Sequence, residues 1–173
     1  MHNTVKNLLE IKNNIKDYLK EIKISNFPKI IAVSKTFDLD KISPLIDHGH
    51  EDFGENKVQE ALEKWSSIKN KNSKIKLHMI GKLQTNKVKY AVQVFDYIHS
   101  VDSEKLAKKI SDEQNKINKK IKIFLQVNIG DENQKSGVNK NDLAKLVSYC
   151  EEIKLDLIGL MCIPPMNIDP ENY

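Results

Sequence analysis

Short apolar runs alternate with amphipathic segments along the chain, and this alternation limits the fold more than any other feature. The runs predict strands at about 29–34, 50–53, 75–80, 95–99, 121–128 and 155–160. Between them, apolar residues recur at helical spacing, as in Leu143, Leu146, Val147 and Cys150. Strands that alternate with helices pair in parallel through right-handed crossovers, so the sequence predicts an α/β fold.

Two architectures satisfy this alternation, an open doubly wound sheet and a (β/α) barrel. No glycine-rich dinucleotide motif follows the first predicted strand. Residues of chemical interest instead follow every predicted strand: Lys35, Asn56, His78 to Lys82, His99 to Asp102, Asn128 and Met161. A barrel collects its site at the carboxyl ends of all its strands, so we favour a TIM-type (β/α) barrel.

The chain fits one domain, residues 1–173, because domains usually contain about 100–200 residues. A closed barrel of this class has eight strands, and the sequence predicts about six. We therefore expect an incomplete barrel that lacks the last two βα units. Phosphate groups in such barrels commonly bind the loops after strands 7 and 8, which this sequence does not supply.

The composition excludes several functions. No apolar stretch approaches the roughly 20 residues that span a membrane, and the N-terminus has no apolar core typical of a signal peptide. All 28 basic residues are lysine, so the bidentate clamps that arginine forms on phosphate are missing. Cys150 and Cys162 lie in apolar contexts and are expected to be buried, inert thiols in the reducing cytoplasm.

Lys35 follows the apolar run Ile30 to Val33 and would share a strand face with Val33 and Ile31. A lysine desolvated in such a place becomes an amine nucleophile for a carbonyl. The alternative is a solvated lysine just past a strand end, which is the commoner outcome for lysine in general.

Several short motifs add a family resemblance in their order and spacing. They are Ala32-Val33-Ser34-Lys35-Thr36, Phe53-Gly54-Glu55-Asn56-Lys57-Val58-Gln59-Glu60, His78-Met79-Ile80-Gly81-Lys82-Leu83-Gln84-Thr85-Asn86-Lys87, His99-Ser100-Val101-Asp102, Gln126-Val127-Asn128-Ile129, Lys135-Ser136-Gly137 and Gly159-Leu160-Met161-Cys162-Ile163-Pro164-Pro165. The sequence with these motifs resembles the pyridoxal phosphate homeostasis protein family. That resemblance covers nearly the whole chain from about residue 29 and implies the barrel of the alanine racemase N-terminal domain.

The resemblance implies that Lys35 holds pyridoxal 5′-phosphate (PLP) covalently as an internal aldimine. It also implies that Asn56 and Met161 line the cofactor pocket, and it places His78 in a signature at the mouth. Residue chemistry leaves simpler roles open. Asn56 suits a helix cap, Met161 suits core packing, and His78 suits a hydrogen-bonded histidine at a strand end.

By the same resemblance the protein binds PLP and serves its homeostasis in the cytoplasm, with PLP-requiring apoenzymes as partners. It implies no robust catalytic activity, no catalytic residues and no metal. Family members continue through a serine-containing strand end and an Arg-Ile-Gly segment that form the phosphate cup, and this sequence has neither.

Two other functions remain open from the sequence. One is a PLP-dependent racemase-like or other Schiff-base barrel enzyme. The other is nucleic-acid binding through Lys82, Lys87 and Lys89, which we disfavour because these lysines equally suit a solvated helix face.

Overall fold

The computed structural model describes residues 1–129 and 136–164. Within this part of the chain, six parallel strands form one sheet in chain order. They are β1 (Ala32–Val33), β2 (Asp52–Glu55), β3 (Lys76–Met79), β4 (Tyr97–Val101), β5 (Lys122–Gln126) and β6 (Asp156–Met161). Each strand pairs with the next along the chain, which confirms the predicted α/β alternation.

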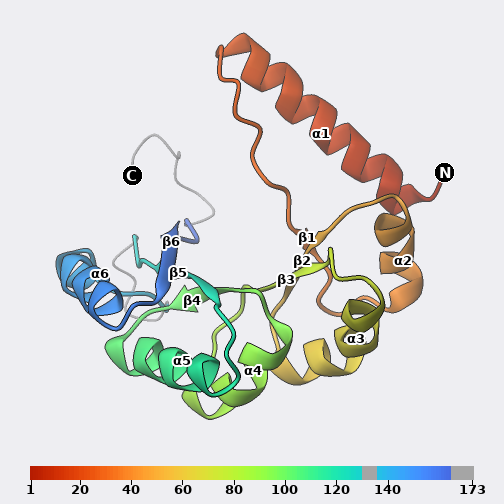
Figure 1. Ribbon diagram of the computed structural model, residues 1–173. Helices are drawn as coiled ribbons and strands as arrows, with labels where there is room; N and C mark the ends of the chain where they lie inside the picture. The colour runs from red at the N-terminus through yellow and green to blue at the C-terminus, as the bar shows by residue number, and fades with distance from the viewer. Residues whose placement is uncertain (130–135, 165–173) are drawn as a thin grey trace.

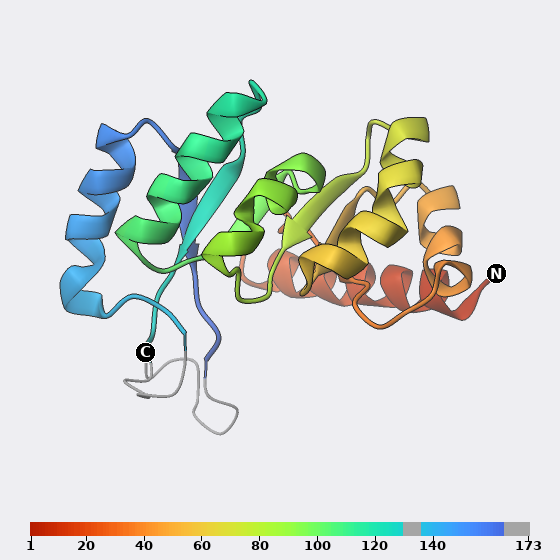
Figure 2. The ribbon, with the colours of Figure 1, turned by 90° about the horizontal axis from the view of Figure 1, so that it is seen from below.

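Six α-helices accompany the strands in the described residues. They are α1 (Asn3–Glu21), α2 (Leu39–Asp47), α3 (Val58–Lys71), α4 (Val88–Val94), α5 (Glu104–Lys116) and α6 (Leu143–Glu152), with short 3-10 helices η1 (Thr85–Lys87) and η2 (Lys140–Asp142). Helices α2 to α6 lie side by side along the same face of the curved sheet, whereas α1 projects away from it (Figures 1 and 2). This arrangement is an arc of a (β/α) barrel, with the helices on its outer side.

One local prediction at the start of the chain was wrong. The first strand was expected over 29–34 but pairs only at Ala32 and Val33, because the chain turns at once and the N–H of Phe37 donates to the carbonyl of Ser34 at 3.2 Å. Helix α2 follows this turn, with Asp38 before its first residue and Pro44 inside it.

Alternate strand residues point into the layer between the sheet and the helices. Phe53 and Leu77 are fully buried there, and the ring of Phe53 lies 4.8 Å from that of Trp65 on α3. Cys150 joins this core as expected, and its burial raises the pKa of the thiol to about 11. Cys162 is exposed, contrary to the prediction, because it follows the end of β6.

The opposite face of the sheet carries a polar cluster that we call the histidine floor: Asp52, His78, Tyr97, His99 and Phe124. The imidazole of His78 contacts Asp52 Oδ1 at 3.0 Å through Nε2 and His99 Nε2 at 2.9 Å through Nδ1. Tyr97 stacks on His78 with ring centroids 4.2 Å apart, and Phe124 stacks on His99 at 4.3 Å.

Both imidazoles of the histidine floor are neutral near pH 7. Burial lowers the pKa of His99 to about 4, with a smaller effect from the neighbouring His78. Burial also lowers the pKa of His78, and the Asp52 carboxylate only partly opposes this. Neutral rings fix the order of the protons: His78 Nε2–H donates to Asp52, and His99 Nε2–H donates to His78 Nδ1.

We predict that acid destabilises the fold through His99. In the unfolded chain this histidine takes up a proton near pH 6.5, whereas in the folded chain it does so near pH 4. The unfolded state therefore binds more protons between these values, and stability is lost as the pH falls through this window, by up to about 3 kcal/mol. Urea unfolding followed by the fluorescence of Trp65, the single tryptophan, measures this loss at several pH values.

The variants for this test are His99→Phe and, as a control, His48→Phe at an exposed position. We expect His99→Phe to lower stability at pH 7.5 but to flatten its decline between pH 6.5 and 4. The control should keep the wild-type decline. An unchanged decline in His99→Phe would contradict the assignment.

Candidate functional site

A cavity of about 380 Å³ lies at the carboxyl ends of β2, β3, β5 and β6. Its lining residues are Asn56, Ile80, Gly81, Lys82, Gln126, Val127, Asn128, Ser136 and Ile163. Among these described residues Lys82 is the one that carries a charge, and the other polar groups are amides and a hydroxyl. The cavity is thus large enough for a small ligand and suited to one that carries negative charge.

Gly81 brings two walls of this cavity together. A Cβ atom at this position would lie 2.8 Å from Asn56 Cα and closer still to its carbonyl oxygen. Only a residue without a side chain lets the backbone after β3 approach the end of β2 so closely. The glycine of the His78-to-Lys87 motif therefore places Lys82 and Asn56 on adjoining walls.

The segment that follows the undescribed residues 130–135 closes another side. Val138 forms a parallel bridge with Val127, and its N–H donates to the carbonyl of Gln126 at 2.7 Å. Gln126 Nε2 donates in turn to the carbonyl of Ser136 at 3.0 Å. Of the Lys135-Ser136-Gly137 motif, Ser136 and Gly137 are thus held against the end of β5, and Lys135 lies outside the described residues.

The histidine floor lies beneath the cavity. Ile80 and Gln126 line the cavity, and the residues two positions earlier on the same strands are His78 and Phe124. Residues two apart on a strand point to the same face, so the floor is the next layer of side chains down. His78, expected at the mouth, is only 2% exposed and belongs to this layer.

Of the other residues expected at the site, Asn56 lines the cavity, whereas Met161 and Lys35 do not. Met161 is the last residue of β6, and its backbone oxygen accepts a hydrogen bond from Val127 N–H at 2.8 Å, but it is not among the lining residues.

Lys35 lies in an exposed turn directly after β1. The desolvation expected from its place beside Val33 is not found, because Val33 is itself 46% exposed. The turn nevertheless lies next to the cavity strands, since Ser34 N–H donates to the carbonyl of Gly54 on β2 at 2.9 Å. The amine is therefore held at the same end of the sheet as Asn56, and it is accessible.

Sequence reasoning missed a buried carboxylate beside this turn. Glu55 Oε1 accepts hydrogen bonds from Ser34 Oγ at 2.8 Å, Lys64 Nζ at 3.0 Å and Trp65 Nε1 at 2.9 Å. We call these four residues the Glu55 clamp. The available signal was an acidic residue in the buried run after Phe53 together with a lysine and a tryptophan on the following helix.

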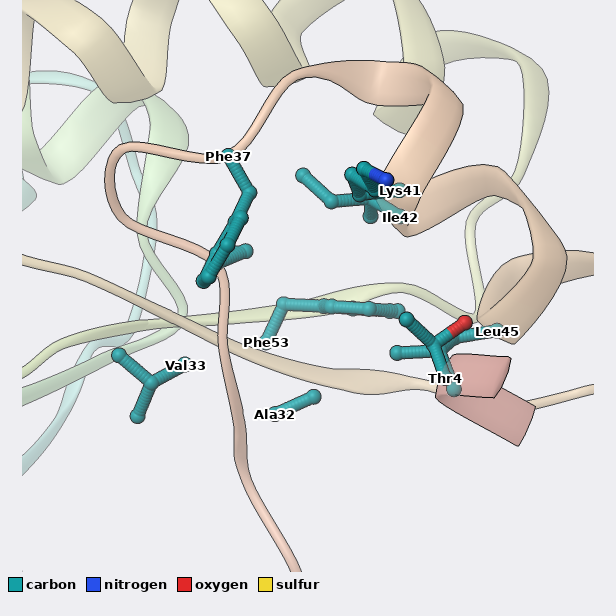
Figure 3. Close-up of a pocket in the computed structure, with 9 residues that line it drawn as sticks. Thr4, Ala32, Val33, Phe37, Lys41, Ile42, Leu45 and Phe53 are labelled. Atoms are coloured by element: carbon teal, nitrogen blue, oxygen red, sulfur yellow. The ribbon is translucent and has the colours of Figure 1, made fainter. Parts of the chain in front are cut away.

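A second cavity, of about 140 Å³, lies on the helix side of β1 (Figure 3). Phe37, Ile42, Leu45 and Phe53 surround it, and Lys41 is the one titratable residue among those that line it. It is a mostly apolar gap in the packing between β1, β2 and α2.

Among the described helices, none combines the length and apolar character that crossing a membrane requires.

The alanine racemase N-terminal domain family model matches residues 7–172. The pyridoxal phosphate homeostasis protein of Pasteurella multocida is 35% identical over 160 residues, which cover 91% of this chain and 69% of that protein. That of Aquifex aeolicus is 37% identical over 148 residues, which cover 85% and 64%. The chain thus spans about two thirds of the length of these relatives.

Solved structures agree with this result. PipY of Synechococcus elongatus with PLP bound is 31% identical, with a TM-score of 0.76 over 91% of this chain and 74% of PipY. Alanine racemase of Clostridium difficile is 15% identical, with a TM-score of 0.64 over 87% of this chain and 40% of the racemase, a likeness of fold alone that agrees with the predicted barrel type. The chain belongs to the alanine racemase N-terminal domain family and, within it, to the pyridoxal phosphate homeostasis proteins.

Proposed function

We propose that this chain binds PLP in intracellular PLP homeostasis and holds it reversibly as a Schiff base on Lys35. The observation that carries the proposal is the cavity at the carboxyl ends of the strands, beside the Lys35 turn, in a fold shared with PipY, which has been solved with PLP bound. The names of the curated relatives support the homeostasis role.

The residues of the cavity fit this cofactor. A phosphate group needs hydrogen-bond donors and no nearby carboxylate, and the described lining supplies Lys82, amide side chains and Ser136 without an acidic group. The aldehyde needs a primary amine, which Lys35 offers from an exposed position. When bound, the cofactor supplies an electrophilic aldehyde carbon.

Capture of the aldehyde is reversible by its chemistry. The Lys35 amine adds to the carbonyl carbon, a C=N bond replaces the C=O bond, and the oxygen leaves as water. Water that enters the exposed turn reverses these steps and frees the aldehyde. An accessible lysine is therefore suited to storing PLP and releasing it to PLP-requiring apoenzymes in the cytoplasm.

A racemase-like enzyme is the alternative function, and the cavity favours it less. Amino-acid turnover needs a base positioned at the α-proton. In the described lining Lys82 is the one side chain able to act as such a base, and both histidines of the floor lie one layer below it. We propose that α-proton exchange is negligible, which mass spectrometry of alanine incubated with the PLP-loaded chain in deuterium oxide measures.

Mapping of the PLP adduct tests the Schiff base. After addition of PLP and reduction with borohydride, peptide mapping should place the phosphopyridoxyl group on Lys35. Lys35→Ala should abolish this adduct. Lys57 after β2 and Lys82 after β3 are the competing described lysines at the ends of the neighbouring strands. Lys41→Ala, which removes a nearby exposed lysine, should leave it unchanged. An adduct that maps to another lysine would show that the assignment is wrong.

A further prediction concerns the close approach of Gly81 to Asn56. In Gly81→Ala, the new methyl group collides with the Asn56 backbone, so the cavity wall must move. We expect PLP retention to fall about tenfold or more, because displacement of a binding group by about 1 Å has effects of this size. Equilibrium dialysis measures it.

Gly159→Ala is the control for this substitution. Its Cβ would meet the Phe124 ring at 3.3 Å, where a side chain and not the backbone can adjust. Retention should remain near that of the wild type. Equal retention by both variants would contradict the proposed role of the Gly81 approach.

A further inference from the structure

We propose that Glu55 and Lys64 are positioning residues that fix the backbone from which Lys35 projects. The inference deepens the proposed function and rests on it for the role of Lys35. It stands on the geometry of the Glu55 clamp, on the conformation of the turn, and on the cost of burying the carboxylate.

Every polar group of Ser34, the residue before Lys35, is hydrogen-bonded, and the clamp supplies two of these bonds. The N–H donates to the Gly54 carbonyl at 2.9 Å, and the hydroxyl donates to Glu55 Oε1 at 2.8 Å. The carbonyl accepts from Lys64 Nζ at 2.8 Å and from the N–H of Phe37 at 3.2 Å. Lys64 thus links the Glu55 carboxylate to the backbone on which Lys35 is mounted.

The turn on the other side of Lys35 has an unusual conformation. Thr36 has a φ of +64°, in the left-handed region that β-branched residues rarely adopt. Such a conformation persists only where the surrounding structure imposes it. Phe37 folds back toward β1, beside Ala32 and Val33 (Figure 3). Lys35 therefore lies between a clamped residue and a constrained one, which sets the direction of its Cα–Cβ bond although its side chain is exposed.

Stability alone does not account for the clamp. The Glu55 side chain is fully buried, and its Oε2 has no hydrogen-bond partner among the described residues. Burying a carboxylate with an unsatisfied oxygen is costly, and apolar residues of similar size often stabilise such a position more. The arrangement instead suits a group that must hold one particular backbone geometry.

Helix α3 offers a matched control five residues further on. Lys69 Nζ donates to the Val94 carbonyl at 2.7 Å and to the Asp96 carboxylate, as Lys64 does to Ser34 and Glu55. The side chain of Lys64 is 14% exposed and that of Lys69 is 18% exposed. Lys69 contacts neither Ser34 nor Glu55, so Lys64→Met and Lys69→Met each remove a lysine that bridges a carboxylate and a backbone carbonyl, and they differ in which backbone they release. The Glu55 side chain is 0% exposed and that of Asp96 is 23% exposed.

The test compares these two variants with Lys64→Arg, which keeps a cation at the clamp. One measurement is hydrogen exchange at the Phe37 amide of the chain without PLP. The other is the rate at which borohydride traps PLP on Lys35. We expect Lys64→Met to speed the exchange and to slow trapping about tenfold or more relative to Lys69→Met, with partial recovery in Lys64→Arg.

The outcomes separate the two proposals. Equal trapping and equal exchange in Lys64→Met and Lys69→Met would overturn the positioning role. If the wild-type chain traps no PLP at Lys35, the proposed function fails, and exchange alone decides on the clamp. Faster exchange in Lys64→Met than in Lys69→Met would then support it, and equal exchange would overturn it.

Discussion

Strand β2 is the element on which the site depends, because all four of its residues are buried and each contacts a different neighbour. Asp52 anchors the histidine floor, and Phe53 packs on Trp65 in the helix layer. The Gly54 carbonyl holds β1 through Ser34, and Glu55 forms the clamp. These roles alternate between the faces of the sheet because strand side chains do. One short strand thereby ties the floor, the core and the Lys35 turn together.

The sequence was sufficient to predict the alternation of strands and helices, because hydrophobic periodicity is a local property. The extent of β1 was not predictable from the apolar run alone, since its end is set by hydrogen bonds to Gly54 and within the turn at Phe37. Tertiary contacts decide such boundaries, whereas periodicity decides only that an element exists.

The candidate site likewise combines features that the sequence predicts with features that it does not. Lys35 and Asn56 follow strands, so their sequence positions alone indicated that both lie at the carboxyl end of the sheet. The placement of His78 depends on partners 21 and 26 residues away. The partners of Glu55 lie 9, 10 and 21 residues away from it. No local pattern encodes these contacts. The family resemblance therefore suggested the chemistry that we propose, and the structure revealed the contacts around Lys35.

Several unusual features lie around Lys35. A buried carboxylate with an unpartnered oxygen, a threonine at positive φ and a serine with all its polar groups bonded lie within one corner of the sheet. Elsewhere the helix layer is mostly apolar, with Ser111, Glu113 and Gln114 of α5 as buried polar residues. Local violations of the usual packing rules are expected where function needs a fixed geometry. Under the proposed function Lys35 must remain accessible for capture and release of PLP, so burial of its own side chain cannot hold it. Its neighbours have to supply the order, and the Glu55 clamp is the part of the structure able to do so.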